Sequence, residues 1–146
     1  MTTTAEEKWG FGPWANEPDR DQWTDETTGI ECLAVRHDRS GHWSGYVAVP
    51  PGHPWFGADY VDLPREDLDV HRGLNYSRAG DTILGLSTTR DDGLWWFGFS
   101  CDHVGDLTPA EIVNDKYALL EGVYRDLRYV RRECVRLAEQ ITEANR

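Results

Sequence analysis

The sequence is short of basic residues and of long apolar runs, and each shortage excludes a class of protein. Its 15 Lys and Arg stand against 26 Asp and Glu, a formal net charge of −11. Because phosphate contacts need clustered Lys and Arg, we expect no direct binding of nucleic acid. No apolar run approaches the roughly 18 residues that span a bilayer, and the first residues lack the pattern of a signal peptide. We therefore expect a soluble, cytoplasmic protein that does not bind membranes.

Cysteine is also scarce. Cys32, Cys101 and Cys134 are odd in number, widely spaced, and form no C-x-x-C pair. This pattern excludes a disulfide framework and the structural zinc sites that need cysteine pairs, and it fits a reducing cytosol. No H-E-x-x-H motif is present either, so the sequence leaves any metal or cofactor unidentified.

At 146 residues, the chain has the length of one domain. Residues 1–29 are polar and rich in turn formers, yet they contain four large aromatic residues: Trp9, Phe11, Trp14 and Trp23. Because disordered segments are usually poor in aromatic residues, we expect an arm whose indoles anchor it on the domain. A ligand clamp made by these rings is the alternative. Residues 30–146 then form a single domain, with a sheet in residues 30–102 and helix in residues 109–144.

Short β-like runs dominate residues 30–102. The runs ECLAVRHD and HWSGYVAVP flank the turn-forming RSG, which predicts a hairpin with Leu33, Val35, Val47 and Val49 facing one core. A Pro- and Gly-rich irregular segment follows, and residues 68–77 and 93–101 are further strands, with residues 81–89 a weaker candidate. The fold class that we expect is α+β: an antiparallel sheet of about four or five strands packed by a long C-terminal helix or helix pair.

The last third of the chain has helical signals. Thr108, Pro109 and Glu111 are suited to the cap, first and third positions of a helix. A continuous apolar stripe then recurs at steps of three and four from Leu120 to Ile141. Gly122 favours a break between two helices. We expect the stripe to dock on the sheet, with a coiled-coil dimer as the alternative.

The length of the stripe bears on oligomeric state. From Leu120 to Ile141 it spans about six turns, more than a small sheet covers. Its far end, around Leu137 and Ile141, is then expected to overhang the sheet as an exposed apolar contact. The stripe therefore predicts a homodimer through the C-terminal helix.

Two predicted strands carry a polar face. Odd residues of Trp95–Asp102 are all apolar, whereas even residues include Gly98, Ser100 and Asp102. In Val70–Ser77, a face with His71, Gly73 and Asn75 is likewise polar, and glycine within a strand often marks the close approach of a ligand. If these faces adjoin, they form a slot for a small ligand. Its candidate binding residues are Trp96, Asn75, Ser100, Gly73 and Gly98, and its candidate catalytic residues are His71, His103, Asp102 and Asp106.

These residue types suit two kinds of chemistry. Imidazole and carboxylate groups can hold a divalent metal, or they can form a general acid/base pair in which the carboxylate orients the ring. Either role requires His71 and His103 to lie within about 8 Å of each other. The structural alternative is that His103 bonds backbone in a turn while Asp102 and Asp106 cap the following helix.

Three other residues are assigned no site role. Cys101 alternates onto the apolar strand face, so we expect a small core residue and not a nucleophile. His42 and His53 lie in glycine- or proline-rich turns, and we expect both to be solvated.

Five segments together resemble a known family: NEPDRDQWTDETTGIECLAVR, GYVAVPPGHPWFGADY, DVHRGLNYS, WWFGFSCDHVGD and YRDLRYVRRECVRLAEQI. The chain is similar over most of residues 17–141 to small uncharacterised proteins encoded by bacteriophages and their bacterial hosts, mostly actinobacteria. The resemblance implies no assigned activity. The family pattern reads V-H-G-G-L-T at residues 70–75, so Arg72 and Asn75 depart from it, as does Ser100 where the family has Asp. The departure at Ser100 removes one carboxylate and weakens a metal interpretation.

Three functions follow as expectations. The first is a phage-type accessory protein with a polar small-ligand site, suited to a nucleotide-like molecule that stacks on Trp96 and serving to counter host defence. The second is an acidic, non-enzymatic inhibitor that docks on a basic host protein by imitating nucleic acid. All of the net negative charge lies in residues 1–108, where acids such as Glu66, Asp67 and Asp69 would steer such a partner. The third is a dimeric structural protein.

Overall fold

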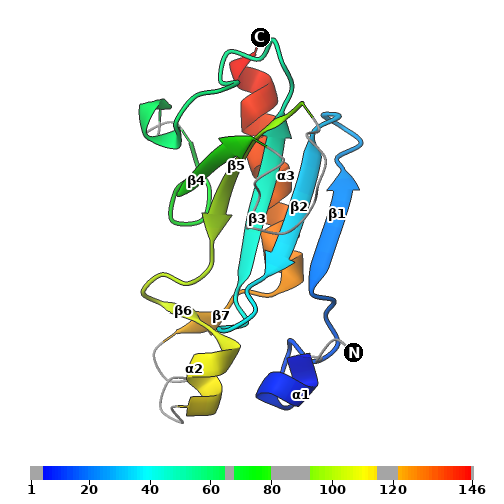
Figure 1. Ribbon diagram of the computed structural model, residues 1–146, viewed down its shortest axis with the longest axis vertical. Helices are drawn as coiled ribbons and strands as arrows, with labels where there is room; N and C mark the ends of the chain where they lie inside the picture. The colour runs from blue at the N-terminus through cyan, green and yellow to red at the C-terminus, as the bar shows by residue number, and fades with distance from the viewer. Residues whose placement is uncertain (1–4, 65–67, 80–92, 115–121, 146) are drawn as a thin grey trace.

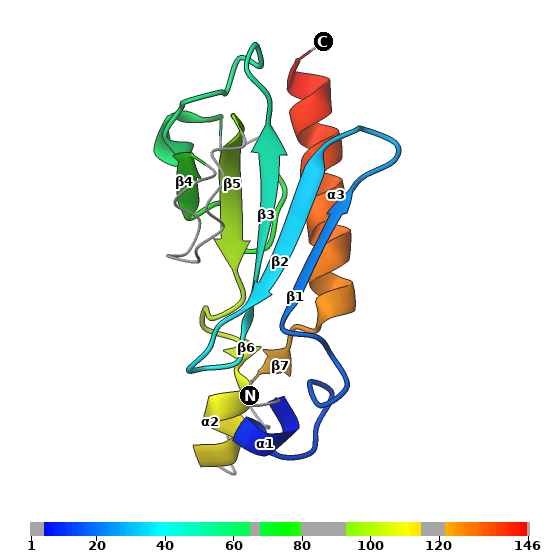
Figure 2. The ribbon, with the colours of Figure 1, turned by 45° about the vertical axis from the view of Figure 1, so that its right-hand side comes forward.

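The computed structural model describes residues 5–64, 68–79, 93–114 and 122–145. Its main element is a five-stranded antiparallel sheet in the order β1-β2-β3-β5-β4 (Figure 1). The strands are β1 (Arg20–Thr24), β2 (Glu31–Arg36), β3 (Trp43–Val49), β4 (Tyr76–Ala79) and β5 (Trp95–Ser100). Helix α3 (Leu127–Ala144) packs along one face, against β2 and β3 (Figure 2). The predicted α+β class and its C-terminal helix are confirmed.

The remaining elements are short, and most of them gather at one end of the sheet. Below the sheet in Figure 1 lie α1 (Ala5–Trp9), α2 (Pro109–Asn114) and a two-stranded parallel ribbon of β6 (Asp106–Leu107) and β7 (Val123–Tyr124). A single 3₁₀ turn, η1 (Tyr60–Asp62), interrupts the irregular segment after β3. No helix in these described ranges is long and apolar enough to cross a membrane.

Both faces of the sheet are packed, which corrects part of the strand prediction. Phe97, Phe99 and Cys101 are buried in the core beneath α3, as their alternation predicted. Trp96, on the opposite face, is nevertheless only 2% exposed, because it packs in a second cluster with Tyr46 and Leu33. The prediction of an open polar face on β5 is therefore wrong at Trp96.

The register of the β2–β3 hairpin corrects a second prediction. Cys32 pairs with Val47 and Leu33 pairs with Tyr46, so odd residues of β2 share a face with even residues of β3. Leu33 therefore packs in the second cluster, whereas Val47 packs beneath α3. The four residues expected on one core are divided between two, with Val35 beside Leu33 and Val49 beside Val47.

The strand predicted from Val70 begins only at Tyr76. A turn closed by the Gly73 N–H and the Val70 carbonyl comes first, and Arg72 and Gly73 have φ values of 55° and 81°. Positive φ is incompatible with an extended strand and favours glycine. The weaker candidate strand at residues 81–89 lies outside the described residues.

The N-terminal arm joins the fold more closely than expected. Trp9 and Trp14 are buried in a cluster with α2 residues, as the aromatic content predicted, whereas Phe11 is exposed. Residues 20–24 form edge strand β1, which pairs with β2 and extends the sheet beyond its predicted start at residue 30. Arg131 of α3 covers the Trp23 ring at 4.2 Å and pairs with Asp21.

The C-terminal helix is shorter than the apolar stripe. Gly122 leads into strand β7, where an added Cβ would lie 2.8 Å from the Gly105 carbonyl oxygen. The helix begins at Leu127, and the Asp126 side chain accepts a hydrogen bond from the Tyr129 N–H. The chain is not helical at Gly122, as the predicted break requires, but Val123 lies in β7 and not in the helical stripe, so that part of the prediction is wrong. Leu120 lies outside the described residues. The predicted cap of the preceding helix is also present, since Thr108 Oγ1 accepts from the Glu111 N–H.

The far end of α3 is covered. Leu137 and Ile141 are both 0% exposed, and they pack with Leu63 and Val70 of the segment after β3. His53 of this segment is also buried and bonds the Ile141 carbonyl through Nε2 at 2.9 Å. The predictions of an overhanging apolar end and of a solvated His53 are therefore wrong, and the stated basis for a homodimer is lost.

Candidate functional site

A pocket of about 870 Å³, lined in part by histidine and carboxylate side chains, opens at the end of the sheet where β3 begins and β5 ends. Antiparallel pairing places Ser44 opposite Ser100, and the Cys101 N–H bonds the Trp43 carbonyl. The same register brings the hairpin loop before β3 beside the turn after β5. The pocket is lined by His37, Ser40, His42, residues 102–108, Ala110, Glu111 and Asn114.

The turn after β5 is anchored by a buried carboxylate. The Asp106 side chain is 0% exposed. Its Oδ2 lies 2.8 Å from His71 Nε2 and accepts from the His103 N–H at 3.2 Å, and its Oδ1 accepts from Arg125 Nε at 3.1 Å. The expected meeting of Asp106, His71 and His103 is therefore present, although 32 residues or more separate His71 from the other two in the sequence.

Both nitrogens of His71 are engaged. Nδ1 lies 2.6 Å from the Tyr129 hydroxyl and Nε2 faces Asp106. The Tyr129 ring meets His71 edge-on and also lies beneath the Arg125 guanidinium at 4.8 Å. A ring with both nitrogens occupied has none left for a substrate. His71 therefore acts as a support behind the pocket, of which it is not a lining residue.

His103 lies between this support and the pocket. Its ring centroid is 6.4 Å from that of His71, which confirms the expected separation of about 8 Å or less. The Nε2 atom of His103 is buried, and no group in the described part of the chain hydrogen bonds it. Buried polar atoms are nearly always paired, and among the few buried side-chain atoms that lack a hydrogen bond in the described part of the chain, this nitrogen belongs to a residue that lines the pocket.

Asp102 belongs to a second His–Asp pair, with a histidine to which the sequence pattern assigns no site role. His42 Nε2 lies 3.7 Å from Asp102 Oδ2, and the Asp102 Oδ1 accepts from the Ser100 hydroxyl at 2.7 Å. Ser100 in turn accepts from Asn75 Nδ2 at 2.7 Å. Asn75 and Ser100 thus orient Asp102 and are not among the pocket-lining residues.

His42 is buried, so the prediction of a solvated residue is wrong. Burial lowers the pKa of His42, and the adjacent Asp102 only partly opposes that shift. Burial acts to raise the pKa of Asp102, but the Ser100 hydrogen bond and nearby His42 outweigh it and leave that pKa lowered. At neutral pH the pair is a neutral imidazole beside a carboxylate.

Ser40 lies next to the His42–Asp102 pair, although no sequence pattern indicates it as a site residue. Its hydroxyl is hydrogen bonded to His42 Nδ1 and lies 3.1 Å from His37 Nδ1. The His37 and His42 rings stack at 4.9 Å. The turn that positions Ser40 needs Gly41, which has a φ of 83° and whose added Cβ would lie 2.7 Å from Pro109. What brings these residues together is the register in which β3 pairs with β5. Local sequence patterns do not contain that register, so they could not indicate this site.

Three predicted binding residues lie elsewhere. Trp96 is buried in the cluster with Leu33, Tyr46 and Ala48 and is only 2% exposed. Gly98 is explained by the Tyr46 ring, whose Cδ1 would lie 2.4 Å from an added Cβ. Gly73 serves the turn before β4. The predicted slot floored by glycines is therefore absent from the described structure, and the pocket forms at the end of the sheet.

The cysteines and the acidic groups do not form a metal centre in the described ranges. No group of three or more His, Cys, Asp or Glu side chains is arranged to hold a metal ion there. All three cysteines are buried and free, as expected for Cys101. Burial raises the pKa of Cys32 to about 12, and it raises that of Cys101 and Cys134 as well. Thiols with raised pKa values are poor nucleophiles.

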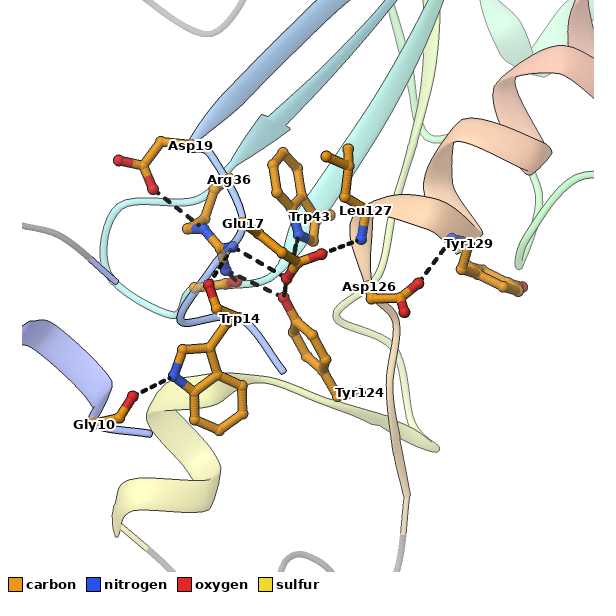
Figure 3. A network of polar contacts seen from close by, with 11 residues as sticks. Gly10, Trp14, Glu17, Asp19, Arg36, Trp43, Tyr124, Asp126, Leu127 and Tyr129 are labelled. Atoms are coloured by element: carbon orange, nitrogen blue, oxygen red, sulfur yellow. Dashed lines mark hydrogen bonds and ion pairs between the residues drawn. The ribbon is translucent and has the colours of Figure 1, made fainter. Parts of the chain in front are cut away.

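A separate polar network ties the N-terminal arm to the sheet and to α3 (Figure 3). The Glu17 carboxylate accepts from Arg36 at 3.3 Å, from the Tyr124 hydroxyl at 2.5 Å and from the Leu127 N–H at 2.6 Å. Burial, followed by the hydrogen bond to Glu17, raises the pKa of Tyr124. Trp43 donates to the Tyr124 hydroxyl at 3.2 Å. These contacts join three segments of the chain and lie apart from the pocket, so we interpret the network as structural.

Comparisons with models of protein families, with curated proteins and with solved structures each find no match. The resemblance to phage-encoded proteins therefore stays a prediction, and the function has to be argued from the pocket.

Proposed function

We propose that this protein binds a small polar molecule in the pocket at the end of the sheet. The observation that carries the proposal is the buried Nε2 of His103, a residue that lines the pocket, with no partner among the described residues. An unpaired buried polar atom costs about 1–3 kcal/mol. A ligand that hydrogen bonds this nitrogen recovers that free energy on binding.

The size and the charges of the pocket define the ligand class. Its volume suits a small organic molecule. Asp102 and Glu111 line it, and no described lining residue is Lys or Arg. Asp106 is offset by Arg125. A phosphate would therefore lie beside two uncompensated carboxylates, so the pocket favours an uncharged or cationic ligand with hydrogen-bonding groups. A nucleoside fits this description better than a nucleotide.

Matched pairs of probes test the ligand class. Uncharged polar fragments, adenosine among them, are titrated beside phosphate-bearing counterparts such as adenosine monophosphate, with ¹H–¹⁵N spectra as the readout. At least one uncharged fragment is expected to shift the amide signals of residues 102–108 and to bind about tenfold more tightly than its phosphate, a difference of about 1.4 kcal/mol. The Asp102→Asn/Glu111→Gln variant should narrow this difference. Unchanged signals throughout, or a preference for phosphate, would contradict the proposal.

Replacing His103 by Phe separates stability from binding. The phenyl ring keeps the shape and removes the unpaired nitrogen, so we expect the free energy of unfolding to rise by about 1 kcal/mol. Affinity for the fragments found above should fall, because the hydrogen bond is lost. His103→Gln, which returns a nitrogen near the position of Nε2, should restore part of the binding and lose the gain in stability. Urea denaturation and the same titrations measure both effects; a destabilised His103→Phe that binds normally would contradict this role.

A further inference from the structure

Ser40, His42 and Asp102 are arranged in series along the wall of the pocket. The Ser40 hydroxyl is hydrogen bonded to one ring nitrogen of His42, and the other ring nitrogen faces the Asp102 carboxylate at 3.7 Å. A nucleophile, a base and a group that orients the base occur in this order in hydrolases of unrelated folds. Of these three residues, only Asp102 is a candidate site residue from the sequence pattern.

The hydrogen bonds determine which nitrogen carries a proton. His37 Nδ1 accepts from the backbone N–H groups of Arg39 and Ser40, so it is already an acceptor. The single proton of the Ser40 hydroxyl is then available to His42 Nδ1. With Nδ1 as the acceptor, the proton of neutral His42 resides on Nε2, directed at Asp102. This is the tautomer that a base needs in order to take the Ser40 proton.

The backbone holds the nucleophile in place. The Ser40 carbonyl accepts from the Ala110 N–H at 2.9 Å, and the His37 carbonyl accepts from the Gly41 N–H at 3.0 Å. These bonds join the hairpin loop to α2 and close the turn that bears Ser40. Asp102 is held from behind by Ser100 and Asn75. Both ends of the series are therefore positioned before a ligand binds, as catalysis by preorganised groups requires.

We propose that Ser40 is a nucleophile activated by His42, and that the protein hydrolyses small carboxylic esters that are uncharged or cationic. The proposal rests on ligand binding in the same pocket. The acyl group is the electrophile of choice because Asp102 and Glu111 disfavour a phosphate ester there.

The reaction proceeds in two balanced steps. Ser40 Oγ attacks the acyl carbon and its proton passes to His42 Nδ1; the ester C–O bond then breaks, and the leaving alcohol takes that proton. Water next attacks the acyl-Ser40 ester while His42 accepts its proton, and Ser40 Oγ leaves with the proton returned. The sum is ester plus water giving carboxylic acid plus alcohol. Asp102 stabilises the imidazolium that forms in each step.

Two probes test the proposal on the full chain. Diisopropyl fluorophosphate, an uncharged reagent for activated serines, is expected to modify one residue, Ser40, as mapped by mass spectrometry. Hydrolysis of p-nitrophenyl acetate is expected to fall about 100-fold in Ser40→Ala and in His42→Gln. Ser77→Ala is the matched control, because it truncates a partly buried serine of β4 that does not line the pocket, and it should stay within about threefold of the wild type. Ser40 is only partly buried, so its truncation leaves the fold intact.

The pH dependence of labelling adds a test that needs no variant. The groups that act on His42 are Asp102, Asp106, His37 and His103, and burial outweighs the two carboxylates. The base is active when neutral, so the rate should rise with pH with a midpoint below the ordinary value of 6.5. Midpoints at or above 6.5 would contradict His42 as the base.

Failure of this proposal is distinguishable from failure of ligand binding. Fragment binding at residues 102–108 with no labelling of Ser40 would overturn the nucleophile and leave the binding function in place. Ester hydrolysis in His42→Gln as fast as in the wild type would overturn the assignment of the base. Labelling elsewhere, with ester hydrolysis unchanged in Ser40→Ala, would also overturn the proposal.

Discussion

Replacement of Asp106 by Asn is expected to lower the free energy of unfolding by about 3 kcal/mol. The Asp106 side chain is completely buried and accepts from three groups, namely His71, Arg125 and the His103 backbone N–H. An Asn amide cannot accept on both sides: its NH₂ group would face either the Arg125 donor or the pair of donors at the other oxygen. The variant therefore leaves either the partly buried Arg125 guanidinium or the donors at the other oxygen without an acceptor.

Asp102→Asn is the matched control for Asp106. It changes the same residue type four positions away, but its side chain is 47% exposed, and a surface substitution usually changes stability by about 0.5 kcal/mol or less. Urea denaturation measures both variants. Equal stability of the two would show that Asp106 does not anchor the turn. A large loss confined to Asp106, with altered amide signals for residues 102–108, would support its role behind the pocket.

Truncation of Glu17 to Ala is expected to cost about 3–5 kcal/mol, a large part of the stability of a domain. This one carboxylate connects the N-terminal arm with β2, β7 and the first N–H of α3, through Arg36, Tyr124 and Leu127 (Figure 3). The Arg36 side chain is 2% exposed and lies 4.7 Å from the centre of the Trp43 ring. Without Glu17 its charge remains buried and only partly compensated.

A double-mutant cycle separates the ion pair from the rest of the network. Arg36→Met removes the buried charge, so the Glu17→Ala/Arg36→Met variant should be more stable than the sum of the two single losses predicts. Asp19→Ala is the control, because Asp19 also pairs with Arg36 but is half exposed, and its loss should cost about 0.5 kcal/mol. Additive losses in the cycle, or a Glu17→Ala variant as stable as the control, would show that the arm is not held by this carboxylate.

Helix caps, strand alternation and helical periodicity could be predicted from the sequence, because each depends on residues close together in the chain. The cap at Thr108, the alternation of Phe97, Phe99 and Cys101, and the apolar stripe of α3 each depend on neighbours within a few residues. Prediction failed where a residue adopts a backbone conformation that its type rarely adopts. Arg72 adopts a positive φ that glycine would favour, and the strand expected there begins only at Tyr76. The Arg72 guanidinium donates to the Val104 carbonyl, a contact that local sequence patterns cannot indicate.

The candidate site divides in the same way. His103, Asp102 and Asp106 were found because three polar residues directly follow a buried strand. The sequence predicts a solvated His42, because a turn beside glycine is usually exposed. Only the pairing of β3 with β5 places His42 beside Asp102. Trp96 was wrongly assigned to a ligand, because alternation separates two faces but does not show that both are covered.

Composition and periodicity in the sequence alone determined the α+β class, the helix beneath one sheet face, the burial of Cys101 and the polar cluster after β5, because each depends on contacts within one element. Tertiary structure decided which faces are covered, which histidines meet which carboxylates, and where the pocket opens. Strand register shifts side chains between faces in steps of one residue, and the residues that set it lie tens of positions apart. The meeting of His42 with Asp102 and of His71 with Asp106 depends on that register and on the turns at the end of the sheet, which no short stretch of the chain contains.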